Sequence, residues 1–273
     1  MTTIALPTTL QRTDRPTGSR VGWAIQDMAT ITWRNLRALT RTPEAVFFST
    51  LQPIMFTLLF VYVFGGAIHT GIPYVDYLMP GIYVQTVAFG AVSTAVGLSE
   101  DLNKGLIERF RALPMARSAV LAGRTSADLV RNVFVVVLIS AVGFVVGFRI
   151  GTNFGLFLCG LLIVLLFSYT LCWGFATLGL SAPNAETAQI MVFPVLFPFI
   201  FASSAFVPVS SMPGWLQAFA KHQPVTQVVD AARSRMTGGS LTDTAAVWAA
   251  LAWCAGLLIV LAPLAVRKYR RVA

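Results

Sequence analysis

The chain has 273 residues, of which 56% are hydrophobic and only 11% are charged, and its formal net charge is +9. Soluble domains carry about 45–50% apolar and about 25% charged residues. A water-soluble fold of this size cannot bury so much apolar surface, so the composition excludes an ordinary soluble protein and makes lipid the solvent for much of the chain.

The N-terminal stretch is polar and lacks the apolar core of a secretory signal peptide, so residues 1–20 are predicted to form a disordered tail. An amphipathic helix is predicted at 21–42. Its polar stripe includes Arg34, Arg37 and Arg41, which suit anionic head groups. Trp23 suits the membrane interface. The helix is therefore predicted to lie in the membrane interface, either as a lipid anchor or as a contact surface for a partner protein.

Six apolar stretches are long enough to cross a bilayer, which takes about 20 residues. They lie at 45–67, 77–99, 125–147, 154–180, 187–207 and 244–266. No stretch carries an acidic residue or a lysine in its middle, so no buried ionisable residue is expected in the membrane. The fold class predicted is an all-α integral membrane protein with a six-span domain over 45–266 and a basic tail at 267–273.

The segment between the second and third spans contains a predicted short amphipathic helix at 100–113. Its apolar stripe consists of Leu102, Leu106, Phe110 and Leu113. Lys104 can pair at i,i+4 spacing with Glu100 and Glu108. Pro114 ends the helix, because a residue before proline is disfavoured in helical geometry.

The segment between the fifth and sixth spans, 207–243, is too polar to span but has helix signals of its own. A short helix is predicted at 213–220 and contains Trp215 and Phe219. A second helix begins at Pro224, which suits a first-turn position. The aromatic residues indicate that this outer helix pair dips back into the interface as a re-entrant element.

The distribution of Lys and Arg predicts the orientation. Of 20 such residues, six precede span one, five lie between spans two and three, and four follow span six, whereas four lie on the other face and Arg131 lies just inside span three. The positive-inside rule then places both termini and the 100–124 loop in the cytoplasm.

The sequence has no G-x-x-x-x-G-K-[ST] loop, so the chain cannot bind and hydrolyse ATP alone. It also has no H-E-x-x-H or G-x-S-x-G motif, and its three cysteines lack metal or disulfide spacing. No catalytic residue and no metal site are therefore predicted. The polar residues of the spans are neutral; interhelical hydrogen bonds account for most of them, and Gln52 and Gln85 are candidates for a substrate path.

The 100–128 segment resembles the membrane permeases of type-2 ATP-binding-cassette exporters, and among them the daunorubicin-resistance-like drug and lipid exporters. The residues that carry the resemblance are Glu100-Asp101, Gly105, Glu108-Arg109-Phe110-Arg111, Leu113-Pro114-Met115 and Gly123-Arg124. The outer segment adds similarity at 208–216 and 223–226. Leu106 departs from the pattern, because many members of the broader family have threonine there.

This resemblance implies that the 100–113 helix is a coupling helix that docks on a separate ATPase subunit beside the 21–42 helix. The expected coupling residues are Glu100, Asp101, Gly105, Glu108, Arg109, Phe110, Arg111 and Pro114. It also implies a bacterial plasma-membrane complex with two copies of the ATPase, which bind ATP and Mg, and a second copy of this chain or a sister permease. The chain itself is expected to bind membrane lipids, with no cofactor and no nucleic acid.

The expected cargo is an amphipathic drug or lipid-like molecule, as in multidrug or antibiotic resistance, because the spans are apolar and rich in aromatic residues. Two alternatives stay open. A membrane-embedded lipid-modifying enzyme would need carboxylate or histidine clusters at the inner interface, and a proton-coupled carrier would need an ionisable residue inside the membrane.

Overall fold

The computed structural model describes residues 20–39, 43–68, 70–105, 117–238 and 244–272, and no strand occurs among them. The helices are α1 (Arg20–Leu39), α2 (Pro43–Leu59), η1 (Phe60–Phe64, a π-helix), α3 (Tyr74–Asn103), α5 (Arg117–Val146), α6 (Phe154–Gly179), α7 (Ala185–Phe201), η2 (Val209–Ser211, a 3-10 helix), α8 (Gly214–His222), α9 (Pro224–Thr237) and α10 (Thr244–Val272). All-helical architecture is the expected solution in lipid, because a helix satisfies its own backbone hydrogen bonds.

Four helices in the described part of the chain are long and apolar enough to cross a membrane, namely α3, α5 from Leu121 onward, α6 and α10. The helices at Thr50–Phe64 and Ala185–Phe201 are apolar but shorter. Each of the six predicted ranges thus contains an apolar helix, and four of these helices have the length and composition of a full span, as expected for an integral membrane protein.

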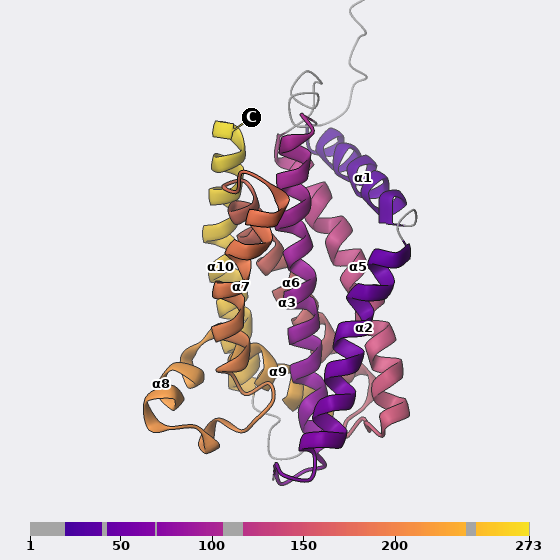
Figure 1. Cartoon of the computed structure of the whole chain (residues 1–273), viewed down its shortest axis with the longest axis vertical. Coiled ribbons are helices and arrows are strands. Elements are labelled where there is room, and N and C mark those ends of the chain that lie inside the picture. Colours follow the sequence, from indigo (N-terminus) through magenta and orange to yellow (C-terminus); the bar gives the residue numbers. More distant parts are fainter. Residues whose placement is uncertain (1–19, 40–42, 69, 106–116, 239–243, 273) are drawn as a thin grey trace, which may run out of the picture.

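Helix α3 is the centre of the bundle, and it packs against α5, α6, α7 and α9 (Figure 1). Within its most apolar 18-residue window 72% of the residues are buried, against 17% in α10. Much of the apolar surface of α10 is therefore free to face lipid or a second protein, whereas most of α3 belongs to the core.

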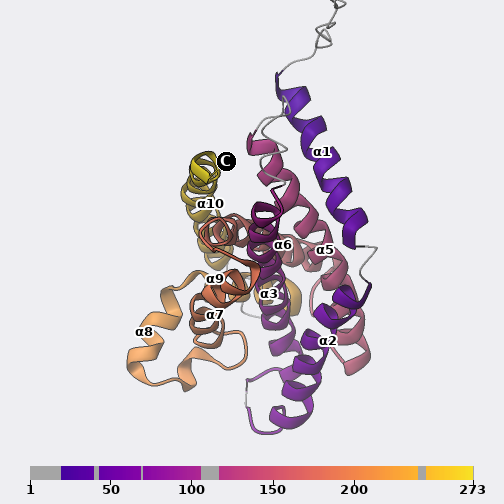
Figure 2. The same cartoon turned by 45° about the horizontal axis from the view of Figure 1, so that its top comes forward.

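Figure 1 places α1, the Asn103 end of α3, the Arg117 start of α5 and the C-terminal end of α10 at one end of the molecule, with α8 and α9 toward the other. Helix α1 slants along α5 at this end (Figures 1 and 2). Ile31 is buried against Gly123, and the Thr32 hydroxyl donates to the Gly123 carbonyl oxygen at 3.1 Å. The N-terminal helix is therefore docked on the third apolar helix.

One predicted helix boundary is wrong, and one predicted tail is helical. Helix α3 continues unbroken to Asn103, so no separate helix begins at Glu100; no breaker precedes Gly105, whose φ of +64° is the left-handed geometry that suits glycine. Helix α10 continues to Val272, so residues 267–272 of the predicted basic tail form the last turns of this helix. The burial of Tyr269 against the bundle explains this extension.

The turn that follows α7, residues 202–208, belongs to the end predicted to face outward and is here called the outer turn. It is held against α3 by hydrogen bonds to its carbonyl groups. The hydroxyls of Tyr74 and Tyr77 donate to the carbonyl oxygens of Phe206 and Ser204 at 3.0 and 3.1 Å. Buried carbonyls outside a helix need such donors. The two tyrosines thus explain how irregular backbone is tolerated at this depth.

Helix α9 is anchored to the same turn by Arg233, which is only 4% exposed. Its Nε donates to the Tyr77 carbonyl oxygen at 3.1 Å, and its Nη2 donates to that of Ser204 at 2.7 Å. Its Nη1 pairs with Asp230 at 2.7 Å, and the guanidinium lies 3.8 Å from the centre of the Tyr77 ring. The arginine therefore joins α3, α9 and the outer turn.

Candidate functional site

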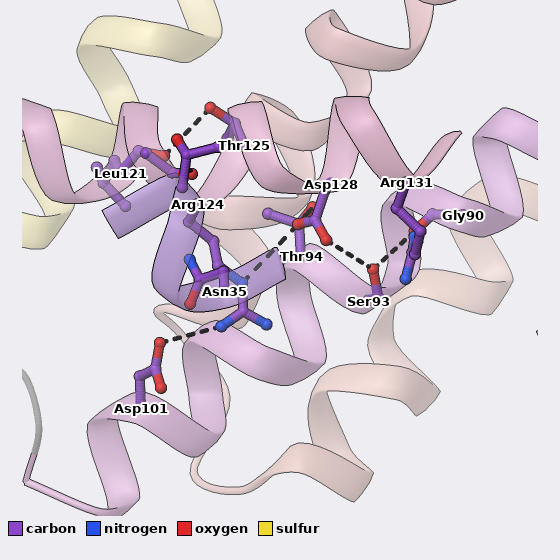
Figure 3. A network of polar contacts seen from close by, with 12 residues as sticks. Asn35, Gly90, Ser93, Thr94, Asp101, Leu121, Arg124, Thr125, Asp128 and Arg131 are labelled. Carbon is purple, nitrogen blue, oxygen red and sulfur yellow. Dashed lines mark hydrogen bonds and ion pairs between the residues drawn. The ribbon is translucent and has the colours of Figure 1, made fainter. Parts of the chain in front are cut away.

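An ion-pair network joins the end of α3 to the beginning of α5 (Figure 3). The Arg124 Nη1 donates to the Asp101 carboxylate at 3.1 Å, and the Arg124 Nε lies 3.8 Å from the carboxylate of Asp128. The side chains of Arg124 and Asp101 are 20% and 18% exposed, so water screens this pair only partly. Arg124 therefore bridges two carboxylates on two helices.

Asp128 is a buried charged residue, with 5% of its surface exposed. Its carboxylate accepts hydrogen bonds from the hydroxyls of Thr94 at 2.6 Å and Ser93 at 3.2 Å, both from α3 (Figure 3). The prediction that the spans bury no ionisable residue is thus wrong. Two hydroxyls and a guanidinium satisfy the carboxylate and offset the cost of its burial.

Two glycines of α3 make room for this network. A Cβ at Gly97 would overlap the guanidinium of Arg124, and a Cβ at Gly90 would overlap the side-chain amide of Asn132. Asn132 in turn donates to the hydroxyl of Ser168 on α6 at 2.7 Å. The two glycines are seven residues apart and therefore lie on one face of α3, where polar side chains of α5 can approach the α3 backbone. With Ser168 the network spans α3, α5 and α6.

The predicted coupling residues fall on both sides of the described boundary. Asp101 belongs to the network, and Gly105 follows the end of α3. Glu100 accepts a hydrogen bond from Lys104 Nζ at 2.8 Å, which raises the pKa of the Lys104 ammonium, but both side chains are exposed and such pairs stabilise little. The other predicted residues, Glu108, Arg109, Phe110, Arg111 and Pro114, lie outside the described residues.

The predicted interfacial residues of α1 have two outcomes. Arg34 and Arg37 are exposed on a helix whose other side packs on α5. The side chain of Trp23 and the whole of Arg41 lie outside the part of the chain that the structure describes. The helix thus presents charge away from the bundle, in keeping with the expected amphipathic pattern.

The structure brings Gln52 and Gln85 together in one cavity of about 140 Å³ between α2, α3 and α5. The cavity adjoins the network, because Gly90, Ser93 and Asn132 belong to both. Its remaining lining residues are Pro53, Thr86, Phe89, Arg131 and Val135. Gln85 is 2% exposed, whereas Gln52 lies at the exposed rim.

The predicted outer residues lie at the other end of the molecule. Pro224 is the first residue of α9, as its helix-start preference indicates. Trp215 and Phe219 project from α8 with exposed fractions of 76% and 42%. These residues are separate from the network and from the cavity, so the predicted sites form two groups at opposite ends.

Sequence reasoning missed the importance of Arg124, Asp128 and Asn132 as a set. The three residues follow one another at four-residue spacing and so share one face of α5. A polar stripe on an otherwise apolar helix, opposite the Gly, Ser and Thr residues of α3, was the signal that could have identified them.

The described residues contain no group of three or more His, Cys, Asp or Glu side chains that could hold a metal ion. Cys159, Cys172 and Cys254 are free thiols, and the latter two are buried.

Residues 26–237 match the family of ABC-2 type transporters. The chain is 35% identical over 265 residues to the daunorubicin resistance ABC transporter permease protein DrrB1 of Streptomyces coeruleorubidus, covering 95% of this chain and 92% of that protein. It is 32% identical over 254 residues to the probable doxorubicin resistance ABC transporter permease protein DrrC of Mycobacterium tuberculosis, covering 87% of each. The chain therefore belongs to the ABC-2 type transporter family, as a membrane permease subunit.

Proposed function

We propose that this permease has six transmembrane spans and exports an amphipathic drug or lipid-like molecule from the cytoplasm or inner leaflet. A separate ATPase subunit, present in two copies that bind ATP and Mg, supplies the energy. The sequence of this chain has no phosphate-binding loop of its own. The names of relatives from two bacterial genera refer to daunorubicin and doxorubicin resistance, which supports a drug-like cargo and a bacterial plasma-membrane location.

The observation that carries the coupling part of this proposal is the ion pair between Arg124 and Asp101. The two residues flank the segment 106–116 on α5 and α3, so this pair ties its two ends together. A load applied to that segment by a docked ATPase then moves α3 and α5 as one body and not as separate helices. Through Asn132 and Ser168 the same load reaches α6.

Six spans are supported by the two shorter apolar helices. The continuous run of α2 and η1 from Pro43 to Phe64 is about 33 Å long at the usual α-helical rise per residue, which is enough to cross a hydrocarbon core about 30 Å thick. Helix α7 has 17 residues and continues into the tyrosine-supported outer turn. With six crossings both termini share a side. By the positive-inside rule the end of the molecule with α1, the start of α5 and the C-terminal end of α10 (Figure 1), here called the arginine-rich end from its sequence, faces the cytoplasm.

Pairing with a second copy of this chain or with a sister permease is part of the proposal. Helix α10 has large apolar side chains on its outer surface, among them Trp248, Ile259 and Val260, which are 69%, 72% and 63% exposed. In the membrane such a face contacts either lipid or another permease. Helices α8 and α9 then cover the outer end of the substrate route as a re-entrant pair.

The test is affinity purification of the tagged chain from its native membrane in a gentle detergent, with identification of bound proteins. A stoichiometric ATP-binding-cassette ATPase is the expected result. The double charge reversal Glu108→Lys with Arg111→Glu is expected to abolish this association and to leave membrane insertion intact. Arg149→Glu, at an exposed arginine on the outer side, is the matched control and is expected to keep the ATPase bound.

If no nucleotide-binding subunit co-purifies even after crosslinking, the separate-ATPase proposal is wrong. If the double reversal leaves both association and export unchanged, the exporter remains but the 106–116 segment is not its coupling surface.

A further inference from the structure

The cavity between α2, α3 and α5 contains a half-buried cation without an acidic partner. None of the ion pairs in the described part of the chain includes Arg131, although it lines the cavity. Its Nη2 donates to the Gly90 carbonyl oxygen. Asp128 bonds to Ser93 on the neighbouring part of the wall, and its charge is already engaged by Arg124 and Thr94.

The position of Arg131 on a membrane-spanning helix makes this lack of a counter-charge notable. Arg131 lies just inside the predicted span 125–147, and the residues that follow it in the helix, 132–146, contain no charged side chain. Ionisable side chains within membrane-spanning segments are rare and mark functional positions.

The cavity has further hydrogen-bonding capacity without partners. The side-chain oxygens of Gln85 and Thr86 are buried and accept no hydrogen bond from the described residues, although both residues are in the cavity wall. The volume of about 140 Å³ far exceeds the roughly 10–15 Å³ that one water molecule needs. The wall contains no acidic residue, so it favours an anionic or strongly polar occupant.

An apolar surface begins where the cavity ends. On α5, next to Arg131, the side chains of Val130, Phe134 and Val137 are 47%, 56% and 61% exposed. On α2, three residues from Gln52, Met55 is 60% exposed. A molecule with its charged group beside Arg131 can therefore lay an apolar tail along α2 and α5.

We propose that this cavity binds the anionic head group of an amphiphile, a carboxylate or a phosphate ester, with Arg131 as the charged ligand and Gln52 and Gln85 as hydrogen-bonding ligands. The inference rests on the proposed export function, and it adds amphiphiles with an anionic group to the drug-like cargo considered there. A resident anionic membrane lipid has the same head-group chemistry and is the second source of such a ligand.

The test is native mass spectrometry of the purified full chain in a neutral detergent. The probes are palmitate and its uncharged methyl ester at equal concentration. The wild-type chain is expected to bind palmitate at least ten-fold better than the ester, and Arg131→Gln is expected to remove this preference. Arg131→Lys retains the charge and is expected to retain most of the preference for palmitate. Arg149→Gln, at an exposed arginine outside the cavity, is expected to retain the full preference.

The source of the ligand follows from competition. If a ten-fold excess of phosphatidylglycerol displaces palmitate, while phosphatidylcholine does not, the cavity holds a phospholipid head group. If palmitate stays bound in the presence of phosphatidylglycerol, the cavity prefers a free anionic amphiphile. Equal binding of palmitate and its ester, or an unchanged preference in Arg131→Gln, overturns the proposal.

Because Arg131→Gln could also weaken folding, Gln52→Leu at the exposed rim serves as a second variant and is expected to lower palmitate binding two- to five-fold. Unchanged palmitate binding in a folded Gln52→Leu variant removes Gln52 from the site. None of these measurements involves an ATPase, so their failure is distinguishable from failure of the co-purification that tests the exporter assignment.

Discussion

The guanidinium of Arg124 fills the space in which a side chain at Gly97 would lie. We expect Gly97→Ala to displace Arg124 from Asp101 and to lower the stability of the protein by about 1–3 kcal/mol, as overpacking usually does. The measurement is the midpoint of thermal unfolding in detergent. Gly256→Ala on α10 meets no atom within 4 Å and is the control; it is expected to be neutral or to stabilise the helix by up to about 1 kcal/mol. Equal midpoints for the two variants contradict the tight fit at Gly97.

The hydrogen bond of 2.6 Å between Thr94 and Asp128 predicts strong coupling between these residues. In a double-mutant cycle of Thr94→Val and Asp128→Asn, we expect an interaction free energy of about 0.5–3 kcal/mol in thermal or denaturant unfolding. Thr237→Val, whose hydroxyl donates to Arg233 O at the other end of the molecule, is expected to be additive with Asp128→Asn. Additivity in both cycles would show that Asp128 does not depend on the α3 hydroxyl.

Burial of Arg233 predicts a large effect of its removal. Arg233→Gln removes the guanidinium donors to the carbonyl oxygens of Tyr77 and Ser204 and the ion pair to Asp230. The Ser204 carbonyl keeps its hydrogen bond from the Tyr77 hydroxyl, and the Asp230 side chain is 42% exposed, so the expected cost is about 1–3 kcal/mol of unfolding free energy. Arg233→Lys restores the charge but not the forked geometry of the guanidinium, and it is expected to recover only part of the lost unfolding free energy. Arg149→Gln, at an exposed site, is expected to stay within about 0.5 kcal/mol of wild type. A Lys variant as stable as wild type argues against the multiple contacts.

The proposed orientation predicts the accessibility of two exposed positions. In a variant with Cys159, Cys172 and Cys254 replaced by alanine, a membrane-impermeant maleimide is expected to label Ser210→Cys in intact cells. Lys104→Cys is expected to react only after the membrane is permeabilised. Labelling with a permeant maleimide provides the control for total reactivity. The reverse pattern would place the arginine-rich end outside the cell.

Sequence alone was sufficient for elements whose signals are local. The proline at 224 marks the beginning of α9, and an apolar run of the right length marks each of the helices α3, α5, α6 and α10. The predicted start of a helix at Glu100 was wrong because an i,i+4 charge pattern is compatible both with a new helix and with the last turn of the preceding one.

The candidate site was harder to predict because its contacts join distant parts of the chain. Gln52 and Gln85 were identified separately as polar groups in a lipid environment, but nothing in their spacing shows that they share a cavity. Asp128 lies near the beginning of its apolar stretch, where a carboxylate usually reaches water. Only the packing of α3 against α5, made possible by Gly90 and Gly97, turns it into a buried group.

The two outer helices differ in how firmly they are attached. Arg233 fixes α9 to α3, whereas α8 packs mainly on α9 and η2, touches α7 through the rings of Phe199 and Phe219, and points Trp215 away from the protein. Because an amphipathic aromatic side chain seeks the lipid–water boundary, the height of α8 follows the position of that boundary. A change in bilayer thickness is therefore expected to move α8 before it moves α9, which Arg233 holds to α3.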